Sequence, residues 1–431
     1  MPRFRIIKYF LVCLVLCLNF DLSVAQTVDY ARKVVNTLAS DDFKGRGYVD
    51  NGDKLAADFI RNEFQKFGLR SFNDSYYQRF ETPVNTFPDE VSVQINGEHL
   101  QVGTDFLIDP SSPSIEGTYD LVTITVDDIL DSDKFFNKLR ASRGKFILLS
   151  PFDVTKYKES QKTRIDEAIR FLKYHFQNPA EGLVILSEDK LNWSGSTVKS
   201  SRPIVTIKSS SIDEDIESIE LNIQGKFHDN YSTQNVIGYI DGQRNDSLIV
   251  LIAHYDHLGM LGKNAVFNGA NDNASGTAML LSLAKHYSEY KPEFNTVFIA
   301  FGAEELGLIG SKYFTEHPLF DLSKVKFLMN FDLAGTGDEG IQVVNGSVYK
   351  DKFDLLTSIN EENKLVPEVR IRGASCNSDH CMFDREDVPG FYIYTLGGIK
   401  AYHDIYDRPE TLPLTEFEDY FELIIEFLAQ L

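Results

Sequence analysis

Residues 247–257 read SLIVLIAHYDH, an apolar run that ends in the polar residues His254, Asp256 and His257. Short apolar runs of this kind are typical of strands that are buried on both faces of a parallel sheet. Strand and helix patterns then alternate along the chain: ASGTAMLLSLAKHYSEY (274–290), NTVFIAFGAEE (295–305), SKYFTEHP (311–318), VKFLMNFD (325–332) and GFYIYTLGG (390–398). The alternation predicts an α/β fold in residues 228–431, with a mostly parallel, twisted sheet flanked by helices.

Polar residues of similar chemistry follow the predicted strands. The set comprises His254, Asp256, Asp272, Glu304, Glu305, Asp332 and His403. Alone, each could cap a helix or a strand end, and the adjacent Glu304 and Glu305 could form the acidic first turn of a helix. However, the carboxyl ends of parallel strands meet at one edge of a sheet, where ligands collect. Two imidazoles and several carboxylates at one edge predict a metal site whose nitrogen and oxygen ligands suit zinc.

The chain before this region divides into two parts. Residues 26–90 include a helix predicted within the stretch 51–70 and stopped by Gly68, and its apolar face comprises Leu55, Phe59, Ile60, Phe64 and Phe67. From about Val91 to Phe227, short β-rich runs such as KFILLS (145–150) and GLVILS (182–187) alternate with polar stretches. We interpret residues 91–227 as a smaller β-rich inserted domain, and we expect it to cover or shape a substrate cleft.

The first residues have the pattern of a signal peptide. Arg3, Arg5 and Lys8 precede an apolar run, and the small residues that follow it end at Ala25. A membrane anchor is the alternative, but the apolar run is short for a span and the charged Asp21 follows it. We therefore expect residues 1–25 to be removed, leaving no membrane span, and the protein to be exported to a periplasm or secreted.

The composition restricts the partners of the chain. The 431 residues include 43 Lys and Arg against 64 Asp and Glu, a net charge of -21. This charge repels nucleic acid and anionic membrane surfaces, so we expect neither as a partner. Without the predicted signal peptide, Cys376 and Cys381 are the remaining cysteines, and an oxidising compartment would permit them to pair.

Several motifs in order resemble one family, the co-catalytic dizinc aminopeptidases. The motifs are LASDDFKGRG (38–47), NVIGYIDG (235–242), AHYDHLG (253–259), GANDNASG (269–276), AFGAEELGLIGSKYF (300–314), MNFDLAG (329–335), SDHCMF (378–383) and YHDIYD (402–407). Wider relatives of this family include glutamate carboxypeptidases, glutaminyl cyclases and the transferrin receptor. The segment 91–227 resembles the protease-associated domain that some members carry.

The resemblance implies two zinc ions per chain. His254, Asp272 and Asp332 would hold one ion, while Asp272, Glu305 and His403 would hold the other, with Asp272 bridging. Two metals at such a site can polarise a carbonyl and make a shared water easier to deprotonate.

The resemblance also implies roles for residues around the metals. Glu304 would be the general base, Asp256 would orient the ring of His254, and Tyr402 would donate a hydrogen bond to the developing oxyanion. A cis peptide is implied between Asp272 and Asn273. Asp379 and His380 match a motif near the pocket, where they could either touch the substrate or support the site.

The sequence thus predicts an exported zinc aminopeptidase that hydrolyses N-terminal residues from peptides. It contains no H-E-x-x-H and no G-x-S-x-G, so neither a thermolysin-like zinc site nor a serine hydrolase is supported. Two alternatives on the same scaffold stay open: a glutaminyl cyclase-like transferase and a non-catalytic binding protein. The preferred substrate residue and the oligomeric state are not specified by these patterns.

Overall fold

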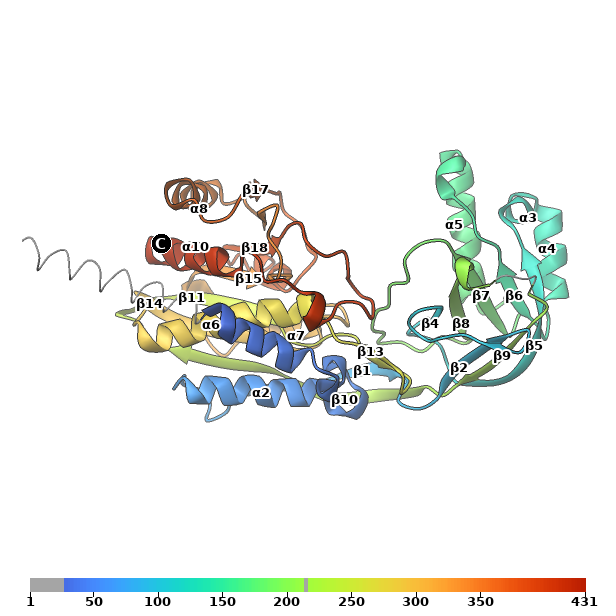
Figure 1. Ribbon diagram of the computed structural model, residues 1–431, viewed down its shortest axis with the longest axis horizontal. Helices are drawn as coiled ribbons and strands as arrows, with labels where there is room; N and C mark the ends of the chain where they lie inside the picture. The colour runs from blue at the N-terminus through green and yellow to red at the C-terminus, as the bar shows by residue number, and fades with distance from the viewer. Residues whose placement is uncertain (1–26, 213–215) are drawn as a thin grey trace, which may run out of the picture.

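The computed structural model describes residues 27–212 and 216–431 and has two parts, each built around a sheet (Figure 1). The predicted signal peptide, residues 1–25, lies outside the described residues. Strands β1 and β10 run from the larger part, which contains the C-terminus, towards the smaller one (Figure 1). Within the described residues, the strands form two eight-stranded sheets and the two-stranded ribbon β12 (Gly259–Leu261) and β13 (Ala265–Phe267).

The first sheet has a parallel centre and antiparallel flanks. In spatial order its strands are β1 (Tyr77–Thr86), β10 (Lys226–Ile240), β14 (Phe294–Phe301), β11 (Arg244–His254), β15 (Val325–Phe331), β18 (Gly390–Thr395), β16 (Ile341–Val344) and β17 (Val369–Ile371). The neighbours β14, β11, β15 and β18 are parallel, while β10 and β16 pair antiparallel with the outer two of them. The predicted α/β fold with a mostly parallel sheet is confirmed.

Helices cover both faces of the first sheet. One face packs against α2 (Gly52–Lys66), α6 (Gly276–Glu289), α8 (Lys350–Asn363), α10 (Phe417–Ala429) and the helix over 27–38. The other face packs against α7 (Ile309–Glu316) and α9 (His380–Asp384). Strand β11 contributes Leu251 to the first layer of the core and Val250 to the second, and both side chains are fully buried. Burial on both faces explains why this strand is apolar at successive positions.

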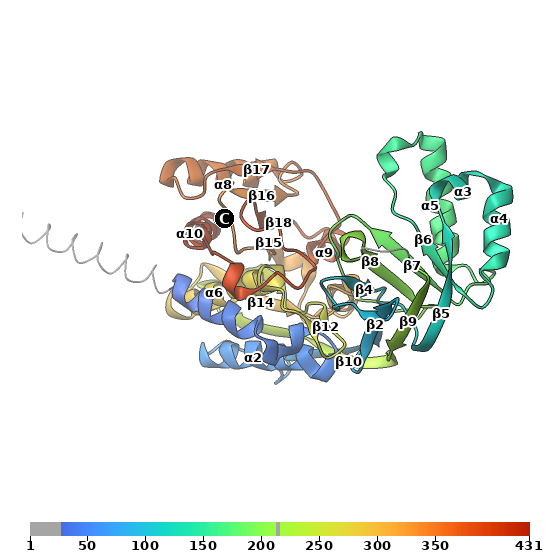
Figure 2. The ribbon, with the colours of Figure 1, turned by 45° about the vertical axis from the view of Figure 1, so that its right-hand side comes forward.

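The second sheet contains the strands between β1 and β10. In spatial order they are β3 (Glu98–His99), β2 (Val91–Ile95), β9 (Ser218–Ile223), β5 (Ile115–Ile124), β6 (Phe146–Leu149), β7 (Gly182–Ser187), β8 (Ile204–Lys208) and β4 (Phe106–Ile108). Figures 1 and 2 place α3 (Val126–Leu130), α4 (Ser132–Ala141) and α5 (Glu159–Tyr174) at the outer end of this smaller part. The boundaries of an independent domain over 91–227 stay a prediction.

The chain enters and leaves the smaller part along one antiparallel ribbon. Strands β1 and β10 pair from Tyr77 opposite Val236 to Thr86 opposite Lys226. The entry and exit of the smaller part are therefore neighbouring residues of a ladder whose other end belongs to the first sheet.

Two further predictions can be compared with the structure. Cys376 and Cys381 form a disulfide, as an oxidising compartment would permit. In the described ranges, no helix is both long and apolar enough to cross a membrane.

The apolar face predicted for the helix over 51–70 was partly wrong. Ile60 and Phe64 are fully buried in α2, but Leu55 is 42% exposed and the first buried turn uses Ala56 and Ala57 instead. Both sets of residues fit a helical period, so the sequence pattern alone does not decide which set is buried.

This difference predicts unequal effects on stability. Ile60→Ala should lower the free energy of unfolding by about 2–5 kcal/mol, because it leaves a cavity between α2 and the sheet. Leu55→Ala should change it by about 0.5 kcal/mol or less. Denaturant unfolding of both variants measures the two values, and equal losses would contradict the assignment of the buried face.

Candidate metal centre

The predicted site residues meet at the carboxyl edge of the parallel strands. His254 ends β11, Glu304 and Glu305 follow β14, and Asp332 follows β15. Asp272 lies in the turn Ala270–Ser275 before α6, and His403 lies in the loop after β18. These residues line one cavity of about 190 Å³, together with Tyr402.

Asp272 lies at the centre of the group. Its Oδ1 is 3.5 Å from Nε2 of His254, and its Oδ2 is 3.1 Å from Nε2 of His403. Each carboxylate oxygen thus faces a different imidazole. This is the arrangement expected of a carboxylate that belongs to two adjacent ligand sets.

The turn that carries Asp272 is held by hydrogen bonds to a second aspartate, Asp407. The carboxylate of Asp407 accepts hydrogen bonds from the backbone N–H groups of Asn271 (2.8 Å) and Asp272 (2.9 Å). The peptide between Asp272 and Asn273 is cis, as the family resemblance implies. These hydrogen bonds fix the backbone from which the central carboxylate projects.

The first predicted ligand set consists of His254, Asp272 and Asp332. Nε2 of His254 lies 3.5 Å from Oδ1 of Asp332 as well as from Asp272, and all three residues are buried. Oδ1 of Asp332 is buried with no hydrogen-bond partner, while its Oδ2 accepts from Ser378. A buried carboxylate oxygen without a donor is costly unless a cation satisfies it, so these residues fit a metal ion.

The second ligand set contains Glu305 and two candidate histidines. Oε2 of Glu305 is 3.2 Å from Nε2 of His403, and its Oε1 is 2.7 Å from Nδ1 of His257. His257, Asp272 and Glu305 have ligand atoms close enough to hold an ion. His403 is nevertheless the better candidate because its Nε2 faces both Asp272 and Glu305, whereas Nδ1 of His257 is hydrogen-bonded to Glu305.

The pKa values of the adjacent Glu304 and Glu305 are shifted in opposite directions. Burial raises the pKa of Glu304 well above its ordinary value; the charges of Glu305 and Asp379 act in the same direction, and His254 opposes them. Burial also acts to raise the pKa of Glu305, but hydrogen bonds with His257 and His403 outweigh it and hold the pKa well below its ordinary value. The two carboxyls are chemically different despite being neighbours.

Asp256 contacts the glutamate pair more closely than it contacts His254. Its carboxylate accepts hydrogen bonds from the backbone N–H groups of Glu304 (3.0 Å) and Glu305 (3.3 Å), but lies 3.8 Å from Nδ1 of His254. The carbonyl oxygen of Asp256 is nearer to that nitrogen, at 3.2 Å. The carboxylate of Asp256 therefore holds the turn of Glu304 and Glu305, while its backbone carbonyl faces the ring of His254.

Of the remaining predicted residues, one lines the cavity and two do not. The ring of Tyr402 stacks on His403, with centroids 4.0 Å apart, and its side chain lines the cavity with Arg372, Asn377 and residues of β18. Asp379 is fully buried, and burial raises its pKa to about 6. His380 is also buried, with Nε2 2.7 Å from the carbonyl oxygen of Ser375. Neither Asp379 nor His380 is among the residues that line the 190 Å³ cavity.

A fully buried arginine lies beneath the centre. Arg46 is directed at backbone carbonyl oxygens from three separate segments: those of Leu38, Tyr255, Asn268, Gly269 and Asp272. Burial lowers the pKa of Arg46 to about 10, while the nearby carboxylates of Asp407 and Asp272 oppose that shift. Arg46 thus brings a positive charge close to a cluster of carboxylates and links the loop of Asp272 to Tyr255, the residue that follows β11.

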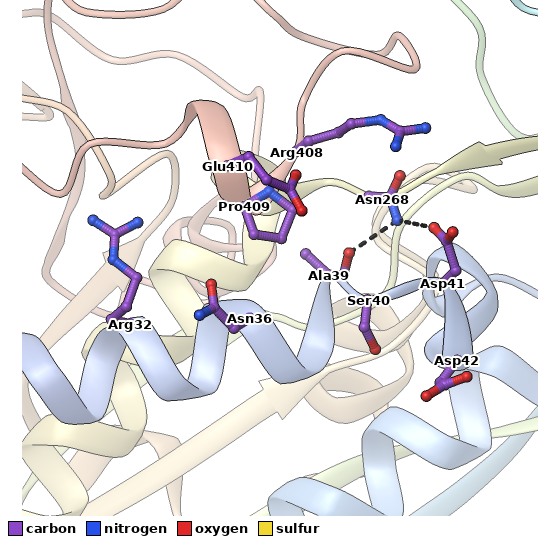
Figure 3. A pocket seen from close by; sticks show the side chains of 10 residues that line it. All are labelled: Arg32, Asn36, Ala39, Ser40, Asp41, Asp42, Asn268, Arg408, Pro409 and Glu410. Atoms are coloured by element: carbon purple, nitrogen blue, oxygen red, sulfur yellow. Dashed lines mark hydrogen bonds between the residues drawn. The ribbon is translucent and has the colours of Figure 1, made fainter.

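A larger cavity, of about 620 Å³, opens on another side of the same loop (Figure 3). Figure 3 shows Asn268 donating hydrogen bonds to the carbonyl oxygen of Ala39 and to the carboxylate of Asp41. Residues 408–410 form the opposite wall. The predicted metal ligands line the smaller cavity, so the larger cavity is not the candidate site. The hydrogen bonds of Asn268 beside the larger cavity help to hold the segment that leads to Asp272.

Comparison with known proteins agrees with the geometry. Residues 235–428 match the profile of "Peptidase family M28". This part of the chain is similar to peptidase family M28. The M28 region contains every predicted metal ligand, and the family prediction is confirmed.

Individual relatives extend the comparison. Aminopeptidase YwaD of Bacillus subtilis (strain 168) is 28% identical over 291 residues, 67% of this chain and 58% of that protein. Leucine aminopeptidase 2 of Arthroderma otae is 33% identical over 131 residues, 30% of this chain and 25% of that one. The structure of BSAP, a zinc aminopeptidase from Bacillus subtilis, has the same fold: the TM-score is 0.67 at 21% identity, covering 93% of this chain and 94% of that one. The chain thus spans little more than half of the first relative.

The sequence patterns did not identify three residues that contact the candidate site or the loops that carry it. His257, Asp407 and Arg46 lie in the motifs AHYDHLG, YHDIYD and LASDDFKGRG, but the groups they contact come from distant parts of the chain. A second histidine three residues after His254 was the one available signal for His257. The spacing of Asp407 and Arg46 carries no comparable signal.

The geometry of Arg46 predicts a large effect on stability. Arg46→Met keeps the apolar stem but leaves buried carbonyl oxygens without donors, so the free energy of unfolding should fall by about 3 kcal/mol or more. Arg170→Met, at an exposed position of α5, is the matched control and should cost about 0.5 kcal/mol or less. Denaturant midpoints measure both, and similar midpoints would contradict the supporting role of Arg46.

Proposed function

We propose that this protein is an exported zinc aminopeptidase that hydrolyses N-terminal residues from peptides. The observation that carries the proposal is the position of Asp272, whose two oxygens face His254 and His403 separately. The match of residues 235–428 to peptidase family M28 and the aminopeptidase names of the relatives support it.

The donor set suits two zinc ions. His254, Asp272 and Asp332 would hold one ion, while Asp272, Glu305 and His403 would hold the other. When bound, the ions would supply Lewis acidity that polarises the scissile carbonyl and eases deprotonation of water.

The chain's own groups would move protons and stabilise charge. Glu304, held by backbone hydrogen bonds to Asp256, would accept a proton from the attacking water and deliver it to the leaving amine. Tyr402, which lines the cavity beside His403, would donate a hydrogen bond to the developing oxyanion.

The names of the relatives support an aminopeptidase over a carboxypeptidase, because both curated relatives described above are aminopeptidases. The cavity is lined by Asp272, Glu304, Glu305 and Asp332 together with Arg372. Two bound zinc ions would offset most of the negative charge of these carboxylates, so the charge of the wall does not by itself select an α-ammonium group.

Export rests on the first residues and on the disulfide. The basic, apolar and small residues of 1–25 have the order of a signal peptide. The disulfide between Cys376 and Cys381 would persist in an oxidising compartment such as a periplasm or the extracellular space.

Metal analysis tests the proposal first. Purified protein should contain about two zinc ions per chain, and a chelator should abolish peptide hydrolysis that added zinc restores. Elemental analysis and assays on aminoacyl and N-terminal glutamine peptides provide the readouts. One tightly bound zinc ion with cyclase activity would establish the transferase alternative instead.

The second test separates the neighbouring glutamates. Glu304→Gln keeps the shape of the side chain, so zinc content and stability should stay near those of the wild type while turnover falls by about 100- to 10,000-fold. Glu305→Gln weakens a metal ligand, so zinc and activity should be lost together. Zinc content and kcat are measured on both variants. Substantial turnover by Glu304→Gln, or metal loss confined to it, would contradict the assignment.

A further inference from the structure

A loop of the smaller part touches the candidate metal centre. Residues 190–195, here called the docking segment, lie between β7 and β8 of the second sheet. Figure 1 shows the loop after β7 meeting the loop that follows β18. His403, a proposed metal ligand, belongs to the second of these loops. A segment of the insert therefore lies directly against the catalytic part.

Trp193 binds both polar ends of His403. The backbone N–H of Trp193 donates to the carbonyl oxygen of His403 at 2.8 Å, and the carbonyl oxygen of Trp193 lies 3.1 Å from Nδ1 of the His403 ring. If Nδ1 carries the proton and donates it to Trp193, Nε2 is left as the nitrogen that can bind a metal. Nε2 is the atom that faces Asp272 and Glu305.

The backbone of His403 needs such support. His403 has a φ of 54°, in the left-handed region that a residue with a Cβ rarely adopts. A conformation of this kind persists only where the surroundings enforce it. The reciprocal contact with Trp193 fixes the backbone and the ring of His403 together.

Lys190 fixes the residues on either side of His403. Its Nζ donates to the carbonyl oxygens of Lys400 (3.0 Å) and Tyr402 (2.9 Å) and pairs with the carboxylate of Asp404 (2.6 Å). An ammonium group has three donors, and these three acceptors match them. The Asp404 side chain is almost fully buried, so this pair is less screened than a surface ion pair.

The docking segment is itself firmly anchored. The Trp193 indole N–H donates to the carbonyl oxygen of Ile108 in β4 (2.8 Å), and its ring packs on Phe267. At its other end, Gly195 approaches the second proposed ligand: a Cβ there would lie 3.2 Å from the carbonyl oxygen of Glu305 and 2.5 Å from the side chain of Leu306. The segment therefore extends from His403 to Glu305, two of the three proposed ligands of the second metal.

We propose that the docking segment is a positioning element for the second metal, in which Lys190 and Trp193 hold His403 in its metal-binding orientation. The inference rests on the proposed function. It makes the affinity of one of the two zinc ions depend on the smaller part of the protein. The first zinc ion, held by residues at the ends of β11 and β15 with Asp272, should not share this dependence.

This role differs from that of a cleft cover. A segment that only shapes the cleft would change KM and the preference among peptides, but not zinc affinity without substrate. A segment that positions His403 would change the affinity of one zinc ion before any substrate is added, because groups behind a metal ligand commonly affect metal affinity by about 10- to 100-fold.

The experiment titrates zinc into metal-free full-length protein with a competing chelator and without substrate. Lys190→Met removes the three contacts and keeps the apolar stem, at a side chain that is partly exposed. Lys199→Met, at an exposed position in the same β7–β8 loop, is the matched control. Lys190→Met should weaken the second zinc ion by about 10-fold or more and leave the first within about 2-fold. Lys199→Met should match the wild type at both sites.

A double variant shows whether the effect passes through His403. His403→Ala already removes the ligand, so adding Lys190→Met should weaken the second zinc ion little further. Unchanged affinities in Lys190→Met, equal weakening of both ions, or additive losses in the double variant would each overturn the inference. A wild-type chain that hydrolyses no peptide and binds fewer than two zinc ions would instead overturn the proposed function beneath it.

Discussion

The structure depends on burying several carboxylates together at one edge of a sheet. Asp272, Glu305 and Asp332 lie within a few ångströms of two or three imidazoles, and burial removes most of the water that would otherwise solvate them. Like charges in a low-dielectric site repel strongly, so the fold must supply positive charge and donors nearby. The histidines supply part of these donors, and the buried guanidinium of Arg46 supplies positive charge close to the carboxylates of Asp272 and Asp407.

The same constraint explains the use of two further aspartates. Asp256 and Asp407 do not face the central cavity with free oxygens; each accepts hydrogen bonds from two backbone N–H groups of a turn that carries a ligand. The turn of Asp272 and the turn of Glu305 are thereby clamped in the same chemical way. These backbone hydrogen bonds set the directions of the Asp272 and Glu305 side chains. Ordering a short aspartate side chain against the backbone costs less conformational entropy than ordering a long side chain would.

The sequence predicts which residues gather at the sheet edge better than it predicts the residues that support them. His254, Glu305 and Asp332 follow apolar strands, and the parallel order of those strands requires their ends to meet, so local pattern and topology suffice. Trp193 supports His403 from 210 positions away through backbone atoms that any residue possesses. The prediction that Leu55 is buried fails for a related reason. A helical period gives the spacing of the residues on a buried face, but it does not say which face the neighbouring elements cover.

The pairing of β1 with β10 has a consequence for how the protein could have evolved. Thr86 and Lys226, where the chain departs and returns, are paired residues of one ladder, so their backbones are about 5 Å apart. Closing a loop between two points already held together costs little more entropy when the loop is long than when it is short. A tight hairpin could join these strands equally well. Gene segments encoding the intervening sheet could therefore have been gained or exchanged without disturbing the registration of the strands that hold the metal ligands.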